Sequence, residues 1–274
     1  MNAPSPETLR RGWCPSTLKP METGDGWLVR LHPPGARLSP AQQRRIAALA
    51  TRHGNGLIEI SARGNMQLRG VTADSHPELV ATLLAERLVD EHDGDGPQRL
   101  TLVSPLACLP RHCEERSDEA IQGASSASGL DCFASLAMTR SSVQPSSSPA
   151  GSSDLIDALA LAAAIEARGR EVAGLPAKFA VVVDGGGESS LEAFAGDMRI
   201  VATAPGRVVM ALADRLWFGP LAESEAGAVV AQVLARFAAK RAQTPDAIRR
   251  MGDLAADELA ALTDLPATEA PAAR

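Results

Sequence analysis

Residues 55–70 read NGLIEISARGNMQLRG, and this stretch combines two short strand patterns with one tight turn. Apolar residues cluster over 57–60, and apolar and polar residues alternate over 66–69, as they do in a strand with one buried face. Gly64-Asn65 between them is typical of a hairpin turn, because both residue types tolerate a positive φ. The stretch therefore predicts a β-hairpin.

Two arginines, Arg63 and Arg69, flank this turn. A guanidinium group is a rigid fork of N–H donors that matches a carboxylate with two parallel hydrogen bonds, so two of them on adjacent strands favour a multiply charged anion. The alternative is a solvated hairpin with ordinary surface arginines, since arginine is mostly exposed in proteins. The hairpin alone leaves both interpretations open.

Two further motifs precede the hairpin, RGWCPS at 11–16 and PMETGDGWLVR at 20–30. Together with the SAR and QLRG pieces of the hairpin, they resemble the first half-domain of the nitrite and sulfite reductase superfamily, and within it the precorrin-3B synthase family. Each motif alone is a weak signal, whereas three in the same order within one short run are a specific one.

Later segments extend the resemblance: RLTLVSPLA at 99–107, LPAKF at 175–179 and VVVDGGG at 181–187. The resemblance implies that Arg63, Arg99 and Lys178 face tetrapyrrole carboxylates or a bound oxyanion. Relatives often carry a second lysine where this chain has Ala180, which argues against sulfite or nitrite chemistry. Without its flanking motif, Lys178 would equally suit the exposed end of a strand.

The resemblance implies an oxygen-dependent oxidoreductase of aerobic cobalamin synthesis that hydroxylates precorrin-3A and forms a lactone. Arg63 and Gln67 are then the expected catalytic residues, with Arg63, Arg69, Arg99 and Lys178 binding the substrate, an anionic tetrapyrrole. Two alternatives stay open, a catalytically inactive tetrapyrrole-binding fragment and a sulfite or nitrite reductase-like protein.

Cysteine usage departs from this family, which holds a 4Fe-4S cluster with four thiolates. The chain has only Cys14, Cys108, Cys113 and Cys132, without the paired spacing that such a cluster needs. We expect the cluster ligands to be absent from this chain, and its histidines show no metal-ligand spacing either, so no metal ligands are assigned. The missing second half of the family's sequence is either encoded separately, as a partner chain, or lost.

Residues 109–153 look foreign to the rest of the sequence. Eleven serines lie between Ser125 and Ser153, and such a composition buries too little apolar surface to offset the entropy of ordering. The two ends of the segment can be written with reverse-complementary codons, which favours an inverted-repeat DNA element as its origin over chance similarity. We expect a disordered insertion.

Composition limits the partners. The net charge of −6 and pI near 5.5 disfavour a nucleic-acid partner, because a phosphate backbone requires a basic face. No apolar run approaches the roughly 20 residues that span a bilayer, and the N-terminus lacks an apolar signal core. We therefore expect a cytoplasmic protein with no membrane partner.

The predicted fold class is α+β, a ferredoxin-like nitrite/sulfite reductase half-domain followed by a mixed α/β tetrapyrrole-binding domain of the sirohaem-reductase type. Residues 39–53 predict a helix with Ser39 as N-cap, Pro40 at its first position and Gly54 after its end. With a strand over 26–32, the two hairpin strands and a helix over about 77–89, the half-domain has the expected order β-α-β-β-α. We also expect a strand over 207–212 and a last helix over 251–263. The expected organisation is an N-terminal extension at 1–20, the half-domain at 21–92, the second domain at 93–108 and 154–265, the insertion at 109–153 and a disordered tail at 266–274.

Overall fold

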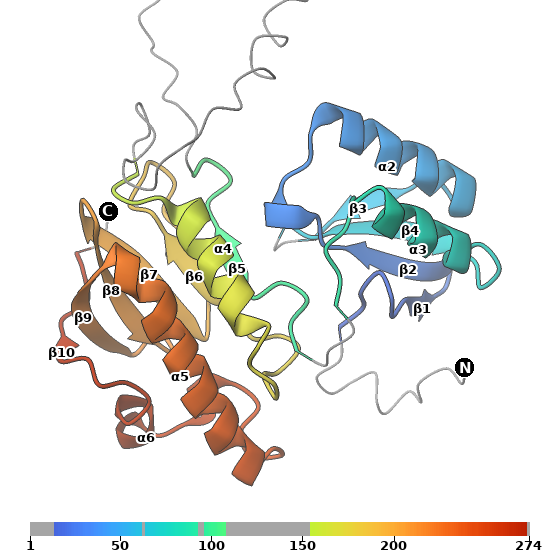
Figure 1. The fold of residues 1–274 in the computed structure, drawn as a ribbon. Coiled ribbons are helices and arrows are strands. Elements are labelled where there is room, and N and C mark those ends of the chain that lie inside the picture. Colours follow the sequence, from blue (N-terminus) through green and yellow to red (C-terminus); the bar gives the residue numbers. More distant parts are fainter. Residues whose placement is uncertain (1–13, 62–63, 93–95, 108–153, 273–274) are drawn as a thin grey trace, which may run out of the picture.

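The structure, a computed structural model, describes residues 14–61, 64–92, 96–107 and 154–272. These residues form two units, each with its own sheet and core (Figure 1). The predicted insertion at 109–153 lies outside the described residues. Within the described ranges, no helix is both long and apolar enough to cross a membrane.

The first unit is an antiparallel four-stranded sheet in the order β1-β2-β4-β3, with two helices on one face (Figure 1). Its elements are β1 Met21–Thr23, β2 Gly26–Leu31, a 3₁₀ turn Pro34–Ala36, α2 Pro40–His53, β3 Ile58–Ile60, β4 Met66–Val71 and α3 His76–Ala85. Leu31, Leu68 and Val71 of the sheet meet Ile46 of α2 and Leu79 of α3 in one fully buried core. Among the residues that the structure describes, helices therefore cover only one face of this sheet.

Helix α2 begins and ends where the sequence predicts. The Ser39 side chain accepts a hydrogen bond from the Gln42 backbone N–H over 3.2 Å, and Gln42 Oε1 accepts one from the Ser39 N–H over 2.8 Å. This reciprocal pair satisfies two N–H groups that the first helical turn leaves free. Gly54 follows the last helical residue, and a Cβ built there would lie 2.3 Å from the carbonyl oxygen of Arg69.

The second unit is a mixed six-stranded sheet in the order β10-β9-β8-β7-β6-β5. Its strands are β5 Thr101–Val103, β6 Val181–Asp184, β7 Met198–Ala204, β8 Arg207–Leu212, β9 Leu216–Ala222 and β10 Ala267–Thr268. β5, β6 and β7 are parallel, and the remaining pairs are antiparallel. The helices α4 Ala158–Gly169 and α5 Glu223–Gln243 lie side by side against the sheet (Figure 1), and Phe237 of α5 packs on Phe179.

Three predictions at element ends are corrected. α3 stops at Ala85 instead of reaching Val89, because Arg87 adopts a positive φ of 52° while Val89 still packs into the core. The helix expected over 251–263 is a 3₁₀ turn, Met251–Asp253, followed by α6 Ala256–Ala260. The tail expected to be disordered from residue 266 instead supplies strand β10, which pairs with β9.

Polar contacts join the two units. Arg99 Nη2 donates to the carbonyl oxygen of Pro33 over 2.9 Å, and Arg37 Nη2 donates to that of Ala107 over 2.6 Å. Arg170 contacts the Asp90 carboxylate with two nitrogens. Each contact pairs an arginine with an oxygen of the other unit, so the junction between the units is polar.

Candidate functional site

The face of the four-stranded sheet that carries no helix is lined by polar side chains. Strand register makes Gln67 of β4 the direct neighbour of Arg30 on β2 and of Glu59 on β3. Because directly paired residues point to the same face, these three side chains lie on one face, and Arg69 follows two residues after Gln67. Leu68, between Gln67 and Arg69, points into the core.

Gln67 and Arg30 are hydrogen-bonded to each other. Arg30 Nη2 donates to Gln67 Oε1 over 3.0 Å, and Gln67 is only 9% exposed. Arg30 Nε is buried with no hydrogen-bond partner among the described residues. The bond fixes the side-chain amide of Gln67 with its oxygen toward Arg30. Gln67, which the sequence predicts as a catalytic residue, is therefore itself oriented by an arginine.

Arg69 already holds a carboxylate. Its Nη2 donates to Asp25 Oδ1 over 2.7 Å and its Nε to Oδ2 over 3.2 Å, while its Nη1 lies 3.7 Å from Glu59 Oε2. The hydrogen bonds from Arg69 lower the pKa of the Asp25 carboxyl, with a further contribution from the Thr23 hydroxyl. Two nitrogens of the Arg69 guanidinium, Nε and Nη2, are therefore already paired with a carboxylate of the protein.

The turn that carries Arg63 is described at its two ends. The Ser61 N–H donates to the Asn65 carbonyl oxygen over 2.8 Å, and the Gly64 N–H donates to the Ser61 carbonyl oxygen over 2.8 Å. Gly64 has a φ of 71°, the left-handed conformation that the turn requires. Strands β3 and β4 thus form the predicted hairpin, while Arg63 lies outside the described residues.

Arg99 lies at the junction between the units. Besides its bond to Pro33, its surroundings include the carboxylates of Glu166 and Asp90. Burial lowers the pKa of the Arg99 guanidinium, and these two carboxylates oppose that shift. Arg99 is half-buried, and the charge of a half-buried guanidinium is screened less by water than that of an exposed one, which favours contact with an anion.

Lys178 is exposed and precedes β6, which begins at Val181. The Phe179 N–H donates to the Pro176 carbonyl oxygen over 2.9 Å, so the lysine sits on a turn rather than within the strand. Of the predicted site residues, Gln67 and Arg69 lie on the helix-free face of the sheet in the first unit. Arg99 and Lys178 belong to the second unit.

Sequence reasoning missed a buried polar cluster beside this face. Glu91 Oε1 accepts a hydrogen bond from the Thr17 hydroxyl over 2.8 Å and lies 2.7 Å from His32 Nδ1. Thr17 also donates to the carbonyl oxygen of Arg30. The cluster fastens the segment before β1 to the end of β2, and its members are too far apart in the sequence for a motif to reveal it.

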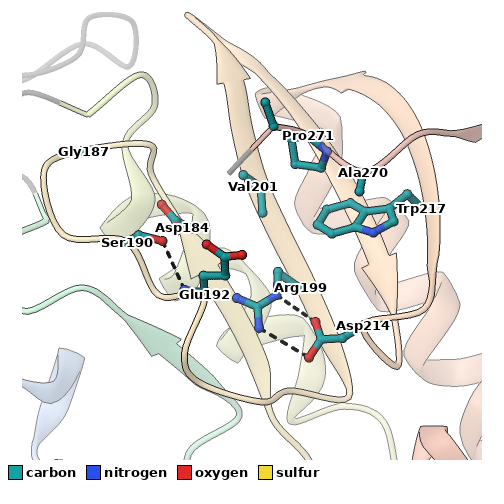
Figure 2. Close-up of a pocket in the computed structure, with 11 residues that line it drawn as sticks. Asp184, Gly187, Ser190, Glu192, Arg199, Val201, Asp214, Trp217, Ala270 and Pro271 are labelled. Atoms are coloured by element: carbon teal, nitrogen blue, oxygen red, sulfur yellow. Dashed lines mark hydrogen bonds and ion pairs between the residues drawn. The ribbon is translucent and has the colours of Figure 1, made fainter. Parts of the chain in front are cut away.

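A separate pocket of about 290 Å³ opens on the second unit (Figure 2). Arg199 at its floor is paired with Asp214 over 2.7 Å and donates to the carbonyl oxygens of Leu191 and Phe194. The Trp217 ring and Pro271 form another part of the lining. Among the described lining residues Arg199 is the only cation, and its charge is already paired with Asp214. None of the predicted site residues is among them.

The thiolate chemistry of a 4Fe-4S cluster does not fit the residues that the structure describes. Cys14 is a free cysteine, and the other three cysteines lie outside the described ranges. Within those ranges no group of three or more histidine, cysteine or acidic side chains is arranged to hold a metal ion. We assign no step to a cluster on this chain.

Comparisons with known proteins give a family match for the first unit and a partial match to one curated relative. Residues 19–86 match the family described as the nitrite/sulfite reductase ferredoxin-like half domain. A precorrin-3B synthase from Sinorhizobium sp is 50% identical over 76 residues, which cover 28% of this chain and 17% of that protein. The match therefore spans only about a sixth of that relative's length.

A solved structure, that of the Mycobacterium tuberculosis NirA protein, is 19% identical with a TM-score of 0.46, covering 77% of this chain and 34% of that one. The matched segment, residues 19–86, contains every strand and both helices of the first unit. Their order is β-β-α-β-β-α, which is the expected β-α-β-β-α order with the short strand β1 added at its start. The first unit therefore has the expected fold, that of the nitrite/sulfite reductase ferredoxin-like half domain, whose family model it matches over residues 19–86.

Proposed function

We propose that this chain binds an anionic tetrapyrrole of the precorrin type, as part of a precorrin-3B synthase-like oxidoreductase of aerobic cobalamin synthesis. The observation that carries the proposal is the 76-residue stretch that is 50% identical to a precorrin-3B synthase. The polar sheet face supports it physically, because a precorrin bears several carboxylates and guanidinium groups recognise carboxylates in pairs.

The candidate site residues have distinct roles in this proposal. Gln67, fixed by Arg30, is a buried amide that can orient a polar group of the substrate. Arg63, in the adjoining turn, is assigned the primary carboxylate contact, and Arg99 provides a poorly solvated charge at the junction. Lys178, exposed on its turn, is a mobile point charge that suits a peripheral carboxylate.

The reaction proposed for the complete enzyme is the oxygen-dependent hydroxylation of precorrin-3A with lactone formation. For this chain we propose the binding and orientation of the macrocycle, since redox chemistry of this kind is carried by a cofactor that the protein positions. A sulfite or nitrite reductase is disfavoured because Ala180 stands where relatives of that kind often carry a second lysine.

The second candidate function is that of a catalytically inactive tetrapyrrole-binding protein. It is favoured by the cysteine content: the chain has four cysteines, and although Cys108 and Cys113 have a suggestive separation, no Cys-x3-Cys pair follows. Iron analysis after anaerobic reconstitution separates the two candidates. About four irons per chain, together with oxygen-dependent product, would establish the enzyme, whereas tetrapyrrole binding without iron or product would establish the inactive binder.

Binding itself is tested by titrating the full chain with uroporphyrin, whose eight carboxylates mimic the charge of a precorrin, and following the Soret band. We expect saturable binding to one site per chain that weakens with added salt, because carboxylate–guanidinium contacts are screened. A linear, unsaturable change in absorbance would contradict the proposed function.

A further inference from the structure

The ion pair between Arg69 and Asp25 places a carboxylate of the protein in the position that a ligand carboxylate would take. Both oxygens of Asp25 are used, Oδ1 by Nη2 and Oδ2 by Nε of the same guanidinium. This two-bond geometry is the one by which arginine recognises free carboxylates. The protein therefore shows, with its own side chain, that Arg69 can hold a carboxylate at this place on the sheet.

The pair is accessible rather than buried. The side chain of Arg69 is 21% exposed and that of Asp25 is 36% exposed. Exposed pairs of this kind contribute little to stability, because water and salt screen them. A competing carboxylate from solution can therefore displace Asp25 at a small energetic cost.

Asp25 also has partners that hold it near Arg69. The hydroxyl of Thr23 donates to Oδ1 over 2.9 Å, and Asn55 Nδ2 donates to Oδ2 over 3.2 Å. Asp25 lies in the tight turn between β1 and β2, where Gly26 has a φ of 114°. The turn therefore holds the Asp25 carboxylate beside Arg69 before any ligand binds.

We propose that Asp25 is an internal competitor that occupies Arg69 until a carboxylate of a multiply charged ligand displaces it, and that it thereby selects polycarboxylates. The proposal rests on the proposed function. A tethered carboxylate acts at an effective concentration of millimolar order or more, so a free monocarboxylate competes poorly. A polycarboxylate already held by other cations presents a tethered carboxylate of its own and competes on equal terms.

The test compares uroporphyrin affinity of the wild-type chain with that of Asp25→Asn. We expect the substitution to raise affinity about two- to fivefold, the effect of releasing an exposed ion pair. The matched control is Glu22→Gln, which removes one negative charge from the exposed side of the neighbouring strand β1. It should change affinity less than Asp25→Asn, because Glu22 does not contact Arg69.

Three further measurements separate competition from a general charge effect. In an Arg69→Ala background, Asp25→Asn should give no gain, since no guanidinium remains to be released. Sodium acetate, compared with sodium chloride at equal ionic strength, should weaken porphyrin binding more in Asp25→Asn than in wild type. Glu59→Gln, which leaves the turn intact, should give a smaller gain in the same direction as Asp25→Asn.

The outcomes also separate this inference from the proposed function. Wild-type binding that Asp25→Asn leaves unchanged or weakens, or a gain that persists without Arg69, would overturn the role of Asp25 and leave tetrapyrrole binding standing. Absence of saturable binding in both wild type and Asp25→Asn would overturn both.

Discussion

Arg30 Nη2 and Gln67 Oε1 are joined by a hydrogen bond of 3.0 Å across the paired strands β2 and β4. The two residues are direct neighbours in the sheet, so the bond is set by strand register rather than by a flexible loop. Gln67, an expected site residue, is thus held by Arg30 of β2, which lies in the 20–30 motif but was assigned no role from the sequence.

Replacing Arg30 should lower the stability of the folded protein. We expect Arg30→Met to lower the free energy of unfolding by about 1–3 kcal/mol, because Gln67 loses its partner in a poorly solvated position. Urea denaturation measures this change. Arg168→Met, on the exposed side of α4, is the control and should change stability by less than about 0.5 kcal/mol. Equal effects at the two arginines would show that the bond to Gln67 has no special role.

The Asp25–Arg69 pair predicts a pH dependence with a defined sign. Arg69 lowers the pKa of Asp25 from its ordinary value of 3.8 in the folded protein. The contribution of the Asp25–Arg69 pair to folding stability is therefore complete above the ordinary pKa of Asp25. It is lost as the pH falls through the lower pKa that Asp25 has in the folded protein. Titration of the Asp25 carboxyl by NMR should show a pKa that rises toward the ordinary value in Arg69→Ala. An unchanged titration in that variant would mean that the two side chains do not interact in solution.

Close packing at the end of α2 can be tested with one methyl group. A Cβ at Gly54 would lie 2.3 Å from the Arg69 carbonyl oxygen, so Gly54→Ala requires the backbone to move. We expect a loss of roughly 1–3 kcal/mol in unfolding free energy, the usual cost of overpacking. Gly252→Ala is matched, because nothing lies within 4 Å of a Cβ built there. Comparable melting temperatures for the two variants would contradict the packing.

In the core of the second unit, an aromatic contact joins α5 to the segment before β6. Phe237 is fully buried and its ring centroid lies 5.2 Å from that of Phe179. We expect Phe237→Ala to cost about 3–5 kcal/mol of unfolding free energy. Phe194→Ala, at a site that is 38% exposed, should lower the free energy of unfolding far less. Differential scanning calorimetry of both variants measures the two losses. A small loss at Phe237 would show that α5 is not part of the core.

Local signals in the sequence predicted the elements they encode. Ser39, Pro40 and Gly54 mark the two ends of α2 because caps and stops act within a few residues. Strand β8, expected over 207–212, has those bounds for the same reason. The hairpin followed from the turn residues and the apolar alternation beside them.

Features that depend on distant partners were missed. β1 and β10 are short strands that exist through pairing with β2 and β9, and neither has a periodicity of its own. The pairing of Arg69 with Asp25 joins residues 44 positions apart. Residue type suggested an anion-binding arginine, but its internal partner became visible only when β1, β2 and β4 were placed side by side.

The central claim, that the hairpin arginines bind a carboxylate-bearing tetrapyrrole, is tested most directly at Arg63. Uroporphyrin affinity should fall by roughly 1.5–3 kcal/mol in Arg63→Ala, as for a lost charge-assisted hydrogen bond. Arg63→Lys should recover only part of the loss, because an ammonium group cannot make two parallel bonds. Arg168→Ala, at the exposed helix position, should leave the affinity nearly unchanged. Equal and negligible changes at Arg63 and Arg168 would contradict the claim and make the hairpin arginines ordinary surface cations.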